Sequence, residues 1–331
     1  MSRKALITGG AGFIGFHLAK TLVARGWQVD LADNMGRGIR DAELEGLLKL
    51  NGVRLIAVNL CNQAAVRELG TDYHHIYHFA AIIGVVHVLN RPYEVLRDNS
   101  LMLANVIGLA RRQMNLDRLL FASTSEIYAG SVARLNALVP TPEKAVIALP
   151  DLDQARTSYM LSKLYGEAMC MQSGLPISIV RPHNVYGPRM GMAHVIPELL
   201  KKAYEGRDGG QLPVASVHHR RAFCYIEDAV EMVIALISTP EGCGQTVNLG
   251  NQTHEVTIGD LAEVVLKVVG RALTVRPTEV TQGSPSRRCP DMSLMTALTG
   301  VAAKVPLDEG IARTFDWYRS NVFDHDGLTA Q

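Results

Sequence analysis

The amino-acid sequence predicts an α/β protein: a doubly wound parallel sheet of the Rossmann type, with a smaller, discontinuous α/β domain. Three observations predict this fold. Short, almost continuously apolar runs alternate with helix-like segments through the first half of the 331-residue chain, as expected of parallel strands buried on both faces. A glycine-rich turn, T-G-G-A-G-F-I-G, follows the first run directly. Beyond Arg181 the texture changes to loops rich in Gly, Pro and His.

The main sheet is expected from short β-rich runs with helix-like segments between several of them. The expected strands are Lys4–Thr8, Gln28–Asp33, Arg54–Val58, His75–Phe79, Leu119–Ser123 and Ile177–Arg181. The expected helices include Gly12–Arg25, Tyr93–Met114 and Ser158–Gln172. Because crossovers between parallel strands are almost always right-handed, a sheet with helices on both faces is the simplest arrangement.

The second half of the chain is expected to leave the main sheet and return to it. Gly187–His194 and Arg207–Arg220 are expected loops, whereas a helix around Asp228–Ile237 and a strand at Thr246–Leu249 rejoin the main layer. We therefore predict a first domain of residues 1–176 and 222–250, a second domain of residues 177–221 and 251–325, and a frayed tail at 326–331.

Composition argues against several classes of protein. A hydrophobic fraction of 47%, a charged fraction of 20% and a net charge of +1 give no broad surface for nucleic acid or anionic lipid. The sequence has no run of 18 or more apolar residues, so no membrane span is expected, and the N-terminus does not read as a signal peptide. Five scattered cysteines without a C-x-x-C pair suggest reduced thiols and a cytoplasmic enzyme.

The glycine-rich turn predicts a dinucleotide site. Gly9, Gly12 and Gly15 stand three residues apart, after a strand and at the start of a helix. Glycine lets backbone amides approach a pyrophosphate, and the helix N-terminus adds partial positive charge. Asp33 ends the second strand, where a carboxylate accepts hydrogen bonds from the adenosine ribose and repels the extra phosphate of NADP. We therefore predict NAD, with NADP kept as the alternative because Arg37 lies close by.

Two further clusters predict catalytic chemistry. S-Y-M-L-S-K places Tyr159 and Lys163 on one helix face, where an ammonium can lower the pKa of a phenol toward neutrality. A phenol tuned in this way can take a proton from a sugar hydroxyl. F-A-S-T-S-E-I-Y-A-G gathers Thr124, Ser125 and Glu126 at the carboxyl end of a strand, which fits either a turn or a catalytic site.

Together these motifs resemble the extended short-chain dehydrogenases/reductases and, more narrowly, the NAD-dependent nucleotide-sugar epimerase/dehydratase family. The resemblance covers almost the whole chain. It includes H-F-A-A at His78–Ala81, D-N-S-L-M-L-A-N-V at Asp98–Val106, R-P-H-N-V-Y-G-P-R at Arg181–Arg189, R-A-F-C-Y-I-E-D-A-V at Arg221–Val230 and R-R-C-P-D-M at Arg287–Met292.

The resemblance implies roles for the matching residues. Thr124 would bind the sugar hydroxyl that is oxidised, Tyr159 would be the general base, and Lys163 would tune it and hold the nicotinamide ribose. Asn184 would contact the substrate near its diphosphate, or simply cap a loop. Arg221 and Arg288 would grip the diphosphate, or form surface ion pairs. The implied cofactor contacts are Gly9, Gly12, Phe13, Ile14, Gly15, Asp33, Asn34, Asn59, Leu60, Ala80, Ala81, Asn99, Tyr159 and Lys163. A turn is an equally good interpretation of Asn59.

The family's shared first step, oxidation at C4 of the hexose, leaves the outcome open. T-S-E at Thr124–Glu126 resembles the nucleotide-hexuronate decarboxylases, whereas hexose 4,6-dehydratases carry T-D-E, and Ser125 is a poor acid. We predict epimerisation first, at C4 or at C5 through Glu126, with hexuronate decarboxylation or hexose dehydration as alternatives. A dinucleotide-sensing regulatory protein and a reductase that releases its cofactor are further alternatives.

Three more expectations concern the surroundings of the site. Ser131–Arg156 is expected to be a long loop that covers the sugar. The resemblance implies a homodimer in which Tyr93–Met114 and Ser158–Gln172 form a four-helix contact. His74, His75 and His78 do not share one strand face, and His218-His219 has no third partner nearby, so no metal site is predicted.

Overall fold

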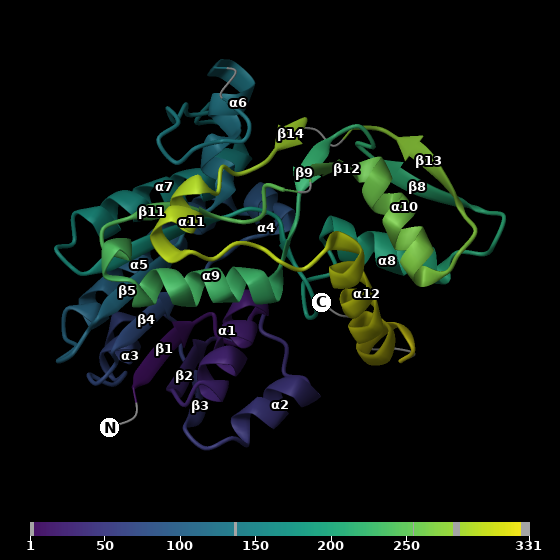
Figure 1. Cartoon of the computed structure of the whole chain (residues 1–331). Helices are drawn as coiled ribbons and strands as arrows, with labels where there is room; N and C mark the ends of the chain where they lie inside the picture. The colour runs from purple at the N-terminus through teal and green to yellow at the C-terminus, as the bar shows by residue number, and fades with distance from the viewer. Residues whose placement is uncertain (1–2, 136–137, 254, 281–284, 326–331) are drawn as a thin grey trace.

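The computed structural model describes residues 3–135, 138–253, 255–280 and 285–325. Its main sheet has seven parallel strands in the order β11-β6-β5-β4-β1-β2-β3 (Figure 1). The strands are β1 (Lys4–Thr8), β2 (Gln28–Asp33), β3 (Val53–Ala57), β4 (His75–His78), β5 (Arg118–Ala122), β6 (Ile177–Pro182) and β11 (Thr246–Leu249). Strand order reverses between β1 and β4, where open α/β sheets bind ligands beyond the carboxyl ends of the strands. The predicted doubly wound fold is confirmed.

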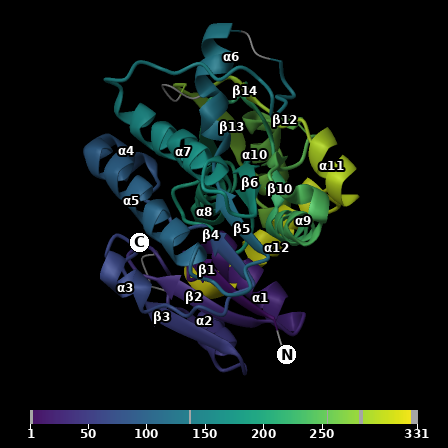
Figure 2. The same cartoon turned by 90° about the vertical axis from the view of Figure 1, so that its left-hand side faces the viewer.

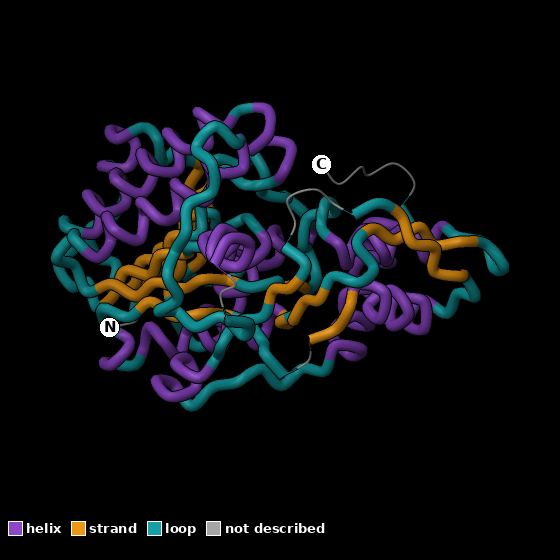
Figure 3. The backbone as a smooth tube through the Cα atoms, turned by 90° about the horizontal axis from the view of Figure 1, so that it is seen from above, coloured by secondary structure: helices purple, strands orange, loops and turns teal. Residues whose placement is uncertain are grey.

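Helices cover both faces of this sheet (Figure 3). One face carries α1 (Phe13–Ala24), α2 (Ala42–Leu48) and α9 (Ile226–Ser238), and the other carries α3 (Gln63–Arg67), α5 (Pro92–Ala110) and α7 (Ala155–Met171). A short helix, α4 (Val85–Asn90), packs against α5 and α7 (Figure 2). The strands read as continuous apolar runs because both of their faces are buried. In β5, for example, Leu120 and Ala122 join the first core while Leu119 and Phe121 join the second.

The remaining elements form smaller sheets and helices beside the carboxyl ends of the strands (Figure 1). The paired strands are β7 (Val185–Tyr186) with β10 (Cys224–Tyr225), β8 (Gln211–Ala215) with β13 (Thr274–Thr278), and β9 (Arg220–Ala222) with β12 (Glu255–Thr257) and β14 (Arg287–Arg288). The helices of this unit are α8 (Val195–Glu205), α10 (Ile258–Val269) and α12 (Leu307–Tyr318), which continues into a π-helical turn, η3 (Arg319–Phe323). Two other elements lie against α9: the helix α11 (Ser293–Thr299) and the short turn η2 (Pro240–Gly242). Among the described residues, no helix combines the length and apolar character needed to cross a membrane.

Four expectations about element positions need correction. β6 is a strand of the main sheet, so residues 177–182 do not belong to the smaller unit as expected. The helix α11 packs against α9 and β11 rather than against the smaller sheets. β8 lies within the expected loop Arg207–Arg220. The expected loop Ser131–Arg156 begins inside α6 (Ala129–Leu135) and ends inside α7. The predicted tail at 326–331 lies outside the described residues.

Candidate active site

The first part of the site is the turn between β1 and α1. Gly9 has a left-handed φ of +69°, and a Cβ atom there would lie 2.8 Å from the backbone nitrogen of Ala80. A Cβ atom on Gly15 would lie 2.3 Å from the carbonyl oxygen of Gly9. Only glycine fits at both positions, so the turn can lie close to a ligand. Gly12 precedes α1 without a side-chain cap, which leaves the first amides of the helix available to an anion.

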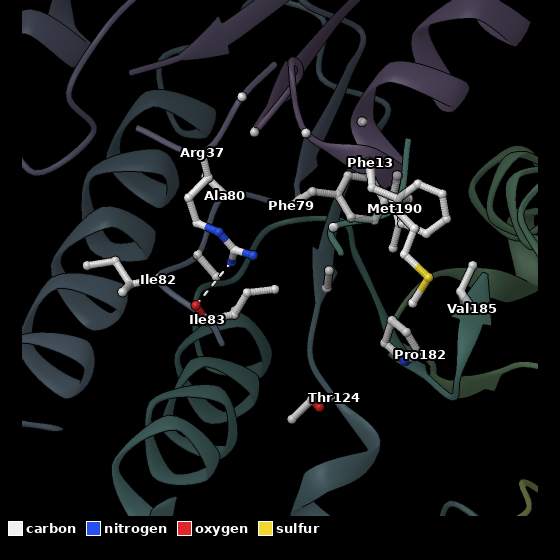
Figure 4. A pocket seen from close by; sticks show the side chains of 18 of the residues that line it. Phe13, Arg37, Phe79, Ala80, Ile82, Ile83, Thr124, Pro182, Val185 and Met190 are labelled. Atoms are coloured by element: carbon white, nitrogen blue, oxygen red, sulfur yellow. Dashed lines mark hydrogen bonds between the residues drawn. The ribbon is translucent and has the colours of Figure 1, made fainter. Parts of the chain in front are cut away.

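Asp33 ends β2 beside this turn. Its Oδ2 accepts a hydrogen bond from the Ala11 amide at 3.0 Å, and its Oδ1 accepts one from the Met35 amide at 2.9 Å. The backbone therefore fixes the carboxylate, which keeps lone pairs for further donors. Arg37 reaches across the cavity, and its Nη1 donates to the carbonyl oxygen of Ile83 at 3.1 Å (Figure 4).

A cavity of about 700 Å³ joins the glycine turn to the end of β5, and its size is typical of ligand sites. Phe13, Phe79 and Met190 gather on the side opposite Arg37 (Figure 4). The predicted site residues that line the cavity are Gly9, Gly12, Phe13, Ile14, Gly15, Asp33, Asn34, Leu60, Ala80, Ala81, Thr124, Ser125, Glu126, Tyr159, Lys163, Asn184 and Arg288.

Three predicted residues lie outside the cavity wall. The Oδ1 of Asn59 accepts a hydrogen bond from the Cys61 amide at 3.0 Å, which matches its interpretation as a turn residue. Asn99 bonds both backbone groups of Ile82 and therefore supports the wall from behind. Arg221 donates to the carbonyl oxygens of Arg220 and Pro285, each at 2.7 Å. Ligand contacts by these three side chains stay predictions.

Thr124, Tyr159 and Lys163 meet at the end of β5. The hydroxyl of Thr124 hydrogen-bonds to the phenol of Tyr159. Tyr159 and Lys163 stand one turn apart on α7, so their side chains share a helix face. The Nζ of Lys163 donates to the carbonyl oxygen of Ala122 at 2.8 Å. Burial lowers the pKa of Lys163 to about 8.

The expected effect of Lys163 on the Tyr159 phenol is wrong for this structure. Burial raises the pKa of Tyr159 well above its ordinary value. The hydrogen bond with Thr124 and the positive charge of Arg37 oppose this rise, whereas the negative charge of Glu126 adds to it. The Nζ of Lys163 lies 6.0 Å from the centroid of the Tyr159 ring and is directed at a backbone carbonyl instead. Arg37 and Glu126 therefore shift the pKa of the phenol in opposite directions.

Glu126 and Arg288 meet at the far end of the cavity. Glu126 lies in the turn η1 (Ser125–Tyr128), which Thr124 caps by accepting a hydrogen bond from the Glu126 amide at 3.2 Å. The Oε1 of Glu126 lies 2.8 Å from Nη2 of Arg288, the last residue of β14. Their side chains are 41% and 18% exposed, so the charges are only partly screened by water. The site therefore contains a cation and an anion beside the Thr124–Tyr159 pair.

Asn184 lines the cavity from the loop between β6 and β7. It adopts a left-handed φ of +39°, and its Nδ2 donates to the carbonyl oxygen of Ala222 at 3.0 Å. The loop-capping interpretation therefore describes its contacts in this structure, while a role toward substrate stays a prediction.

A buried ion pair behind Thr124 was missed by the sequence reasoning. Nε and Nη2 of Arg181 donate to the two carboxylate oxygens of Glu167 at 2.9 and 2.7 Å. The hydroxyl of Ser123 donates to the same carboxylate at 2.5 Å. Glu167 follows Tyr159 and Lys163 at the same four-residue spacing along α7, and this spacing is the signal that could have found it.

A glycine cradle, an acidic strand end and a Thr–Tyr–Lys group around one cavity define an extended short-chain dehydrogenase/reductase. The chain matches the model of the NAD dependent epimerase/dehydratase family over residues 5–250, and it therefore belongs to that family. The similar proteins include decarboxylases, epimerases, a dehydratase and a reductase.

Two curated relatives and one solved structure illustrate the similarity. The UDP-N-acetyl-alpha-D-glucosaminuronate decarboxylase of Bacillus cytotoxicus is 29% identical over 96% of this chain and 98% of that protein. The UDP-glucuronic acid decarboxylase 1 of Xenopus tropicalis is 31% identical over 97% of this chain and 73% of that protein. The UDP-glucose 4-epimerase of Thermus thermophilus, solved with NAD, is 26% identical with a TM-score of 0.78, over 96% of this chain and 100% of that one.

The cavity fits NAD, the cofactor of the family. The close packing at Gly9 and Gly15 leaves room for a pyrophosphate where any side chain would intrude, and the α1 amides suit its charge. Asp33 would hold the adenosine ribose, and Tyr159 with Lys163 lies at the other end of the cavity, where the reactive ring would meet the substrate.

Proposed function

We propose that this enzyme decarboxylates a nucleoside-diphosphate hexuronate through a transient 4-keto sugar. One observation carries the proposal: the cavity holds Arg288 paired with Glu126 at 2.8 Å, beside the Thr124–Tyr159 pair. A guanidinium in this position can bind a sugar carboxylate, which neutral hexoses lack. We therefore prefer decarboxylation to the epimerisation that the sequence favoured.

The first step is oxidation at C4 of the sugar. The Thr124 hydroxyl orients the C4 hydroxyl, and Tyr159 takes its proton. NAD held in the cavity would supply the hydride acceptor for C4 and the hydride donor for the final reduction. Burial raises the Tyr159 pKa, and the positive charge of Arg37 opposes that rise and so favours the phenolate.

The second step is loss of carbon dioxide from C5. With a ketone at C4, the C5–C6 bond can break so that carbon dioxide leaves and its electron pair forms an enolate, with negative charge on O4. Thr124 and Tyr159 hydrogen-bond that oxygen. Arg288 orients the carboxylate before cleavage, while the nearby Glu126 repels it and so favours its departure. A proton is then added at C5, and the C4 ketone is reduced to the pentose.

Epimerisation at C4 is the second candidate. It is favoured by the solved UDP-glucose 4-epimerase, whose fold covers nearly the whole chain. In that reaction the sugar turns over between oxidation and reduction. Glu126 would then have only a structural role, while Arg288 would keep its expected role toward the diphosphate. Classical 6-hydroxyl elimination is disfavoured because buried Ser125 is a poor acid.

The test uses UDP-glucuronate and UDP-N-acetylglucosaminuronate labelled with ¹³C at C6, together with GDP- and dTDP-sugars, in D2O. We expect labelled carbon dioxide from at least one hexuronate and a pentose product that carries deuterium at C5. Interconversion of C4 epimers with all labelled carbon retained would replace this proposal with the second candidate.

We further propose that the enzyme is a cytoplasmic homodimer. Val86, Leu89, Tyr93 and Tyr165 are each more than half exposed, and they lie on α4, α5 and α7, which contact one another (Figure 2). Exposed apolar groups on adjoining helices support association through this surface. All five cysteines are described, and each is a free thiol, which supports a reducing compartment.

A further inference from the structure

We infer that Asn248 is a positioning residue that holds Glu126 and Arg288 opposite each other, with residues 138–154 acting as the strap that completes its contacts. The inference deepens the proposed function and rests on it. Asn248 lies near the carboxyl end of β11 and is fully buried. None of the sequence motifs pointed to it.

The Asn248 amide connects the segments that carry the two charged residues. Its Oδ1 accepts a hydrogen bond from the Tyr128 hydroxyl at 3.0 Å, and Tyr128 ends the same short turn that contains Glu126. Its Nδ2 donates to the carbonyl oxygen of Asp291 at 3.1 Å, three residues after Arg288. One amide group thus links the Tyr128 side chain of the first segment to the Asp291 backbone of the second.

The strap supplies further contacts of Asn248. Its Nδ2 also donates to the carbonyl oxygen of Thr141 at 2.9 Å, and its backbone amide donates to Oε1 of Glu143 at 2.8 Å. β11 is the edge strand of the main sheet, so its outward amides need partners from outside the sheet. Glu143 meets that need with a side chain from the strap.

The strap is also hydrogen-bonded to the residues that follow Arg288. The Thr141 amide donates to the carbonyl oxygen of Cys289 at 2.9 Å, and the Asp291 amide donates to the carbonyl oxygen of Thr141 at 3.0 Å. On its other side, Nη1 of Arg181 donates to the carbonyl oxygen of Glu143 at 2.9 Å and to the Tyr128 hydroxyl at 2.7 Å. The strap therefore fixes the Arg288 segment to the turn of Glu126 from both sides.

A small cavity marks the point where these segments converge. Its volume is only about 10 Å³, and its lining includes Ser125, Tyr128, Thr141, His183 and Arg288. Side chains from four separate segments thus pack around one point with little free space. A shift of any one segment would move Arg288 relative to Glu126.

This arrangement predicts a specific defect when Asn248 is changed. C4 oxidation depends on Thr124, Tyr159 and Lys163, none of which contacts Asn248 directly among the hydrogen bonds of the described residues. The C5 step depends on the Glu126–Arg288 pair. A positioning variant should therefore oxidise substrate but fail to complete the reaction, so that cofactor accumulates as NADH.

The experiment compares Asn248→Asp, Tyr128→Phe and a control, Asn251→Ala, in the full-length holoenzyme. Aspartate keeps the shape of Asn248 but cannot donate to Thr141 and Asp291. Tyr128→Phe removes the phenol hydroxyl with its hydrogen bonds to Asn248 and from Arg181, and it changes the volume little. Asn251 is similarly buried, but within the described part of the chain its side chain bonds only Thr253 in its own turn. Single-turnover absorbance reports the NADH fraction, and product analysis reports overall turnover.

We expect overall turnover to fall about 10²-fold in Asn248→Asp and about tenfold in Tyr128→Phe, with a raised NADH fraction in both, because displacements near 1 Å can cost 10²-fold. The control should match the wild type in NADH fraction even where its melting temperature falls. An NADH fraction that stays at the control value in both variants would overturn the inference, since oxidation and completion would then fail together.

The inference and the proposed function fail separately. A wild-type enzyme that releases no labelled carbon dioxide from hexuronates refutes the decarboxylation. The positioning role is then judged by substrate KM with whichever nucleotide sugar the wild type oxidises: Asn248→Asp and Tyr128→Phe should raise it as Arg288→Gln does, and an unchanged KM in both, equal to that of the Asn251→Ala control, would refute it.

Discussion

Tyr159 and Lys163 stand one turn apart on a single helix, whereas Glu126 and Arg288 come from segments far apart in the sequence and meet only at the cavity. The first pair sits on the large parallel sheet, and its geometry is set by helix periodicity. The second pair depends on β14, on the strap at 138–154 and on Asn248. The half of the site that carries out oxidation is therefore local, because helix geometry fixes it. The half proposed to act at C5 is assembled from segments that are distant in the sequence.

This difference teaches where chemical variety can arise in such a fold. The local half can stay unchanged while the assembled half is altered by loops on the other side of the cavity. The similar proteins fit this view, because they share the fold and include decarboxylases, epimerases and a dehydratase. Removing a feature of one half should therefore leave the function of the other half measurable.

The largest effect is expected from Tyr159→Phe, which removes the proton acceptor of the local half. Turnover should fall toward 10⁴-fold, at the upper end of what a positioned general base contributes. NAD binding, measured by calorimetry, should change little because the glycine cradle and Asp33 are untouched. Turnover within tenfold of the wild type would remove Tyr159 from the mechanism.

Glu126→Gln removes the anion of the assembled half and should slow the overall reaction about 10²-fold. Oxidation should continue, and it is followed as NADH that accumulates in a single turnover. The double variant with Arg288→Gln should cost little more than either single change, because the two side chains form one pair. A harmless Glu126→Gln variant would instead support simple C4 epimerisation.

The same division explains how much the sequence could predict. The glycine turn, Asp33 and the Tyr159–Lys163 spacing depend on short-range geometry, so their placement around one cavity follows from the expected strands and helices. Asn248 and Glu143 carry no local signal, since each matters only through partners distant in the chain. The domain boundary at residue 177 was misplaced although the strand Ile177–Arg181 was expected, because pairing with β5 and β11 keeps β6 in the main sheet.

The pKa of Tyr159 was mispredicted for a related reason. Helix spacing brings Lys163 to the correct face, but the ammonium donates to the Ala122 carbonyl, and burial dominates the phenol. The hydrogen-bond partner of a buried charge depends on the packing around it, and a sequence motif contains no information about that packing.

Lys163→Met tests how much the buried Lys163 ammonium lowers the stability of the folded protein. Burial lowers the pKa of Lys163 from 10.5 to about 8, so at pH 7 the folded protein must bury an ammonium ion. After allowance for the lost hydrogen bond to Ala122, the variant should be more stable by about 2 kcal/mol at pH 7, though inactive. Because the penalty falls as pH rises above 8 and vanishes above 10.5, the variant's advantage should disappear there and leave it about 1 kcal/mol less stable, through the lost hydrogen bond to Ala122. Denaturant titrations at pH 7 and pH 10.5 measure this, and an equal or lower stability of the variant at pH 7 would contradict the buried charge.

Arg37→Ala should have the smallest effect, and it tests whether the two halves are coupled through charge. Arg37 reaches from the loop after β2 to the Ile83 carbonyl, and its positive charge lowers the pKa of Tyr159 while Glu126 raises it. The oxidation rate should rise with pH as the Tyr159 phenol ionises. In Arg37→Ala this rise should shift to higher pH, with a loss of up to about tenfold in rate at pH 7. In Glu126→Gln it should shift to lower pH. Arg37→Lys is the matched control, because it keeps the charge and should keep the profile. Arg37→Ala could instead weaken NADP binding and leave the NAD-dependent pH profile unchanged. That result would show that Arg37 acts on the cofactor's ribose and not on the phenol. The two halves of the site would then be electrostatically independent.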